Sequence, residues 1–94
     1  MTTSKDHSQK NLEKKLVTFI YTKFIETIRV DGKEPTDRKY EEITKIGRTT
    51  ISKIRKCEGY DVPISTISKI CLYAGISLSE FFSKFEEYQA GKKD

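Results

Sequence analysis

The chain has 94 residues and a formal net charge of +4; 35% of its residues are hydrophobic, 11% aromatic and 34% charged. This length predicts one domain, the apolar content excludes a chain that is disordered throughout, and the basic excess favours an anionic partner. Cys57 and Cys71 form no CxxC pair and His7 is the one histidine, which argues against a zinc site or a redox pair.

The N-terminal segment shows no targeting pattern. Residues 1–15 lack an apolar run, and nowhere does the chain approach the roughly 18 consecutive apolar residues that are needed to cross a bilayer. We therefore expect a cytoplasmic protein with no membrane partner.

The first ten residues differ in character from the rest of the chain. Residues 1–10 are polar and without periodicity, which predicts a flexible basic arm. A single domain would then occupy 11–90, with a disordered tail at 91–94. Within that domain we expect a helix over about 11–30, which Asp31-Gly32 would end. Its inward face comprises Leu12, Leu16, Phe19, Ile20, Phe24 and Ile28, which recur at helical spacing.

Two short helices joined by a tight turn are expected next. Thr36 can cap a helix over 37–44 whose first residue is acidic, as the helix dipole favours. Ile46-Gly47 then predicts a turn, and a third helix follows over 48–57, closed by Glu58-Gly59.

Two further helices complete the chain. The run from Pro63 to Ala74 predicts a fourth helix that stops at Gly75. Its inward side comprises Ile64, Ile67, Ile70, Cys71 and Ala74. Ser77 and Glu80 have the spacing of a capping box, which opens a fifth helix to about 89. Since no strand-like alternation or repeat interrupts this pattern, the sequence predicts an all-α bundle of five short helices.

The third helix has two contrasting sides. At 100° per residue Ile51 and Ile54 face inward, whereas the outward side carries Thr49, Ser52, Lys53 and Lys56. Arg48 in the first turn opposes the helix dipole, at a cost on the order of 0.3 to 1 kcal/mol, so helix stability does not account for it. No acid occurs between 45 and 57. A polyanion such as DNA would bind favourably to this face and to the dipole at the start of the helix. The alternative is that the face is only solvated, as a charged helix face commonly is.

A short helix, a tight turn and a helix with an apolar inward side form a helix-turn-helix. Here ITKIGRTTISKI followed by PISTISKICLYAGISLSEFF resembles the Cro and C1 repressors, the XRE family, from about Thr36 to Phe82. The resemblance implies a lambda-repressor-like, five-helix, all-α DNA-binding domain. It places base contacts at Arg48, Thr49 and Lys53, and phosphate contacts at Thr36, Arg38, Thr50, Lys56 and Tyr60. The core positions that it implies are Ile46, Ile51, Ile54, Ile67, Ile70, Ile76 and Leu78.

Three residues depart from the family pattern. Lys45 stands where the turn usually has glycine, so either Lys45 is left-handed or the turn differs. Glu41 replaces a small residue, so either the helices cross more loosely or Glu41 points outward. Arg55 occupies the place of a glutamate that the family pairs with an arginine. The pair is either inverted, with Glu26 or Asp31 as the acid, or Arg55 reaches to water or phosphate.

The fifth helix is the expected dimer surface. One recognition helix reads about half a site, so such proteins generally pair across a two-fold axis. Four aromatic residues within eight positions exceed what a small core needs. We expect Phe82, Phe85 and Tyr88 at the interface, the alternative being that all of them fold back over the first helix.

We therefore expect a sequence-specific DNA-binding transcriptional regulator of the repressor kind, which binds a palindromic operator as a homodimer and needs no cofactor. Two alternatives stay open. One is an antitoxin or restriction-modification controller with a toxin or other protein partner, and the other is a protein-interaction adaptor that no longer binds DNA. We expect no enzymatic activity, because the sequence has no Cys-His pairing, glycine-rich phosphate loop or convergent carboxylates.

Overall fold

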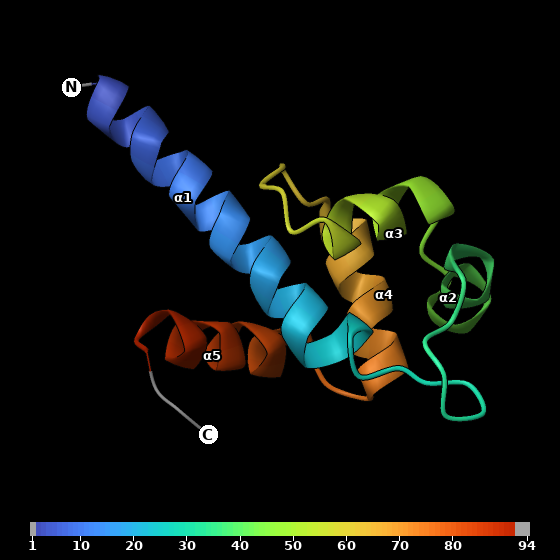
Figure 1. Cartoon of the computed structure of the whole chain (residues 1–94). Helices are drawn as coiled ribbons and strands as arrows, with labels where there is room; N and C mark the ends of the chain where they lie inside the picture. Colours follow the sequence, from blue (N-terminus) through green and yellow to red (C-terminus); the bar gives the residue numbers. More distant parts are fainter. Residues whose placement is uncertain (1, 92–94) are drawn as a thin grey trace.

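The computed structural model describes residues 2–91, with side chains from residue 11 onward, and this part of the chain is all-α (Figure 1). The elements are α1 (Thr2–Ile20), a π-helical turn η1 (Tyr21–Ile25) that continues it, α2 (Asp37–Thr44), α3 (Arg48–Arg55), α4 (Ile64–Ala74) and α5 (Leu78–Gln89). Over the described range the extended structure is limited to one β-bridge between Val30 and Lys33. The predicted all-α fold of five helices is confirmed.

Helix α1 differs from its prediction at both ends. It begins at Thr2, so residues 2–10 continue the helix, and its N-terminal end projects from the other helices (Figure 1). The flexibility of residues 1–10 stays a prediction, and residues 92–94 of the expected tail lie outside the described range. At its other end the helix widens, because Glu26 N–H donates to Tyr21 O at 2.7 Å, and the left-handed Asp31 and Gly32 come after it.

Helix α2 has the predicted bounds. The hydroxyl of Thr36 caps it by accepting a hydrogen bond from Lys39 N–H at 3.2 Å. Lys45 ends it in the left-handed region, with φ 68°, which decides between the two predicted alternatives for this turn. The turn is held by Thr44, whose buried hydroxyl donates to Tyr40 O at 2.8 Å and accepts from Ile46 N–H. Hydrogen bonds of Thr44 to both sides therefore hold the turn around the left-handed Lys45.

The later helices stop where the sequence predicts or two residues earlier. Helix α3 ends at Arg55 rather than at 57, because Cys57 is already left-handed. Gly75 is left-handed after α4, and the hydroxyl of Ser77 accepts from Glu80 N–H at 3.0 Å, which is one half of the predicted capping box. Gly59, in the loop after α3, lies against α1: a Cβ there would be 3.1 Å from Lys14 N.

The core lies where α1, α3, α4 and α5 meet, and some predicted core residues are outside it. Ile51, Ile54, Ile67 and Ile70 are buried, as is Cys71. The exposed residues among those predicted inward are Leu12, Ile64, Ala74 and Leu78. Ile64 and Leu78 are the first residues of their helices, and Leu12 lines a surface pocket that Gln89, the last residue of α5, also lines.

Aromatic side chains join α1 to α5. The ring of Phe19 lies at the centre, with its centroid 5.4 Å from Phe81, 5.3 Å from Phe85 and 5.3 Å from Tyr88. Such pairs add to the burial free energy of each ring. This cluster fixes the position of α5 against the first helix.

Candidate nucleic-acid interface

The exposed side of α3 is polar and basic, and the buried side is apolar. Ile51 and Ile54 are 0% exposed, so they anchor the helix in the core. Thr49, Lys53 and Lys56 are exposed, and Thr50 and Ser52 are half-buried. The two sides of the helix are therefore arranged as the sequence predicts. An anchored helix that presents arginine, lysine and hydroxyl groups outward has the donors that phosphates and guanine edges accept.

Arg48 lies at the first position of α3 and is paired with α2. Its Nε–H donates to Glu41 Oε1 at 2.9 Å, and the side chains remain 62% and 42% exposed. Glu41 therefore points outward, which decides between the two predicted alternatives. The pairing itself was not predicted, although the signal was present: an acid replaces a small residue on α2, across the turn from an arginine.

Lys53 lies over an aromatic ring. Its Nζ is 5.3 Å from the ring centroid of Tyr60, in the loop after α3, which is a favourable position for a cation. The hydroxyl of Tyr60 is buried without a hydrogen-bond partner, and this burial raises the pKa of Tyr60. The phosphate contact predicted for Tyr60 stays a prediction; in this structure its hydroxyl is covered by the protein and its ring supports Lys53.

The other residues predicted to hold phosphates surround α3. Thr36 and Arg38 are exposed at the start of α2, where they line a shallow surface pocket together with Lys39 and Glu42. Thr50 is half-buried, and Lys56 is exposed at the C-cap of α3. The first turn of α2 also has a helix N-terminus, whose free N–H groups favour an anion. These contacts stay predictions.

Arg55 at the end of α3 has acidic partners, but not the two that were predicted. It donates to Asp37 Oδ1 at the start of α2 and, at 3.0 Å, to Glu34 Oε2 in the loop before it. The expectation of Glu26 or Asp31 is wrong, because the loop after η1 brings Glu34 rather than those residues to α3. An inverted pair at this place is nevertheless what the structure has.

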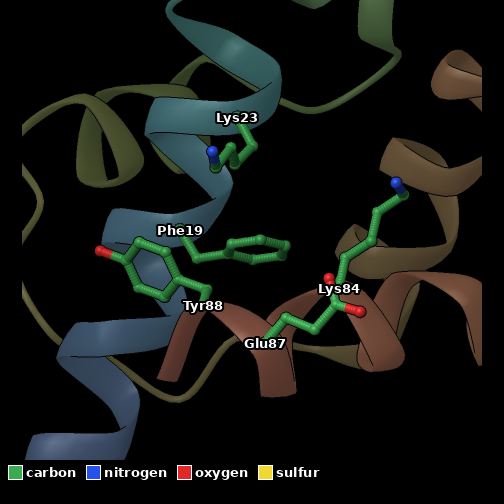
Figure 2. A pocket seen from close by; sticks show the side chains of 5 residues that line it. All are labelled: Phe19, Lys23, Lys84, Glu87 and Tyr88. Atoms are coloured by element: carbon green, nitrogen blue, oxygen red, sulfur yellow. The ribbon is translucent and has the colours of Figure 1, made fainter. Parts of the chain in front are cut away.

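The residues predicted for the dimer interface are divided between core and surface. Phe85 is 6% exposed, and the ring of Tyr88 packs on Phe19, so for these two residues the alternative of folding back over α1 applies. Figure 2 shows Phe19 and Tyr88 side by side in a pocket that Lys23, Lys84 and Glu87 also line. Phe82 is 39% exposed and remains a surface residue.

The part of the chain that the structure describes lacks a metal-ligand cluster, a membrane-spanning helix and a disulfide. No three His, Cys, Asp or Glu side chains within it gather as a metal site would require. None of its helices combines the length and the apolar character of a membrane span. Cys57 and Cys71 are both free thiols.

Comparison with protein-family models matches residues 39–86 to the Cro/C1-type HTH DNA-binding domain. This match covers just over half of the chain and includes the whole of α3 and α4. No curated protein and no solved structure matches the chain.

Proposed function

Since the chain belongs to the Cro/C1-type helix-turn-helix DNA-binding family, we propose that it is a sequence-specific transcriptional regulator, which represses by occupying its operator. The observation that carries the proposal is the outer face of α3, where Arg48, Thr49 and Lys53 are exposed above the buried Ile51 and Ile54. A helix anchored in this way can enter the major groove without loss of its packing.

The proposed interface has two kinds of contact, one to base edges and one to phosphates. Arg48, Thr49 and Lys53, on the first two turns of α3, read base edges in the major groove. Thr36 and Arg38 from α2, with Thr50 and Lys56 from α3, hold the phosphates and so set the register of α3 on the duplex. Because these contacts release counterions, affinity should fall steeply as salt rises.

We further propose that two copies bind a palindromic operator. One α3 reads only about half a site, and a two-fold pair places a second α3 one helical turn away. Leu78 and Phe82 on α5 support this proposal, because they are exposed apolar residues four positions apart and so share a face of the helix. Phe82 thus stays at the proposed interface and Leu78 joins it, whereas Phe85 and Tyr88 are no longer expected there.

Selection of bound sequences from random duplexes at moderate salt tests the DNA-binding proposal. We expect enrichment of a two-fold symmetric sequence, and binding to it that weakens with salt. Replacing both Arg48 and Lys53 by alanine should abolish the enrichment while the protein stays folded by circular dichroism. Unchanged activity of that variant in cells would instead favour an adaptor that does not use DNA.

Sedimentation of the full chain tests the dimer. Phe82→Lys should shift the population toward monomer and weaken binding to the full operator more than binding to a half-site. Leu72→Lys is the matched control, since Leu72 on α4 is 80% exposed and lies outside the proposed interface. Equal effects of the two variants would exclude α5 as the dimer surface.

A further inference from the structure

The pair that links α2 to α3 indicates how an arginine at the DNA interface is directed. We propose that Glu41 is a positioning residue that sets sequence specificity: by holding Nε of Arg48, it directs the two terminal amino groups of the guanidinium to a guanine in the major groove. This inference rests on the proposed function, because it assumes that α3 meets DNA.

Glu41 is well placed to hold its partner, because its helix is fixed on both sides of it. Tyr40, directly before it, and Thr44, three residues after it, are 0% and 2% exposed, and the carbonyl of Glu41 accepts the N–H of Lys45 at 2.8 Å. The carboxylate therefore projects from a rigid segment, and Arg48 is the first residue of α3 across the turn. In a helix-turn-helix the first residues of the second helix are those that approach base edges.

Arginine has enough N–H donors to bind Glu41 and a guanine at the same time. A guanidinium has five N–H groups in one plane, and the bond to Glu41 uses the one on Nε. The four on Nη1 and Nη2 remain, and a guanine needs two donors, for O6 and N7. Because the carboxylate already orders the long side chain, less conformational freedom is lost when the guanine is bound.

The charge of Glu41 also opposes the competing contact. An arginine at the edge of an interface can bind a phosphate of any sequence, which adds affinity without discrimination. A carboxylate beside Arg48 repels phosphates but accepts an N–H of the guanidinium. Glu41 should therefore weaken sequence-independent binding and strengthen the preference for guanine, which are two effects of opposite sign on DNA affinity.

The test measures affinity for three duplexes: the selected operator, the same operator with the base pair read by Arg48 exchanged, and an unrelated sequence. Arg48→Ala identifies that base pair as the one at which preference is lost. Glu41→Met, which keeps length without an acceptor, should lower discrimination at this pair about tenfold and raise affinity for the unrelated duplex. Glu41→Gln, which keeps an acceptor oxygen, should retain most of the discrimination.

Two controls separate positioning from general electrostatics. Glu42→Met removes the neighbouring acid, which pairs with Lys39, and should leave discrimination unchanged. In the Arg48→Ala background, Glu41→Met should have no further effect on discrimination, because the two residues act together. Thermal unfolding of each variant checks that the helices remain folded.

The outcomes distinguish this inference from the function on which it rests. If Glu41→Met strengthens binding to all three duplexes equally, Glu41 acts only as a repulsive charge and the inference is overturned, while the proposed function stands. A selected operator without guanine at the pair read by Arg48 also overturns it. If the unaltered protein binds no duplex, the proposed function itself fails.

Discussion

The guanidinium of Arg55, at the end of α3, donates a hydrogen bond to the carboxylate of Asp37, at the start of α2. The same group lies 5.5 Å from the ring centroid of Tyr40 and also reaches Glu34. Burial alone would lower the pKa of Arg55, but the hydrogen bond and charge of Asp37, with Glu34, more than offset this and raise it. Arg55 thus joins α3 to α2 and to the loop that precedes α2.

Replacing Arg55 by methionine should destabilise the protein. The change removes two charged hydrogen bonds and a cation–π contact from a side chain that is 33% exposed, so we expect a loss on the order of 1 kcal/mol in the free energy of unfolding. Urea denaturation measures this loss. Lys39→Met, which breaks the more exposed pair with Glu42, is the control and should cost less than about 0.5 kcal/mol. Equal losses would show that the Arg55 network has no special role.

Lys45→Gly should stabilise the protein. Lys45 has φ 68°, a conformation that costs an ordinary L-residue roughly 1–2 kcal/mol and glycine little, although glycine is also freer in the unfolded chain. We expect a net gain of about 0.5 to 1 kcal/mol in urea denaturation. The converse change, Gly75→Ala at φ 73°, should destabilise by a similar amount. A loss of stability in Lys45→Gly would mean that the lysine side chain makes a contact that outweighs its backbone strain.

Lys56→Ala should weaken DNA binding without changing its sequence preference. If Lys56 holds one phosphate, the slope of log affinity against log salt should become shallower by about 1 when that phosphate is no longer neutralised. Fluorescence anisotropy over a salt series measures the slope for operator and unrelated duplexes. Lys84→Ala on α5 is the control with the same change of charge. An unaltered slope in Lys56→Ala would exclude the phosphate contact.

Stability should decline in alkaline solution because of two tyrosines whose hydroxyls are buried. Burial raises the pKa of Tyr60; burial and the charge of Glu34 raise that of Tyr40 despite the nearby Arg55. In the unfolded chain both ionise near their usual pKa of about 10. The stabilisation from keeping them neutral is therefore fully present below about pH 10 and is lost as pH rises through the raised values.

Urea denaturation between pH 8 and 11 measures this decline. The double variant Tyr40→Phe/Tyr60→Phe is the control, since it removes two buried hydroxyls that have no hydrogen-bond partner. It should lose less stability over this range than the unaltered chain, and its DNA affinity at neutral pH should be unchanged. A steeper decline in the double variant would exclude the tyrosines as the cause.

Local signals were sufficient to predict the helix-turn-helix. Thr36 at the N-cap indicated the bounds of α2, and the spacing of Ile51 and Ile54 indicated the buried side of α3. The resemblance to Cro and C1 repressors, carried by residues on both sides of the turn, was confirmed by the family match over 39–86. These features depend on neighbours in the sequence, which is why they could be read from it.

Features that depend on distant parts of the chain were not predicted correctly. The acids that meet Arg55 are decided by the path of the loop after η1, which no local pattern specifies. Which aromatic rings of α5 are buried depends on how that helix crosses α1, and this places Phe85 inside and Phe82 outside. The polar residues 2–10 have no apolar stripe, but a helix that has already formed can extend through them.

Gly59 brings the loop after α3 into close contact with the first helix. The loop after α3, which begins beside Lys56 and carries Tyr60 beneath Lys53, approaches the backbone of Lys14 so closely that a methyl group on Gly59 would press against it. Helix α1 thus supports that loop from behind, and any residue larger than glycine at position 59 would require the loop or α1 to shift slightly.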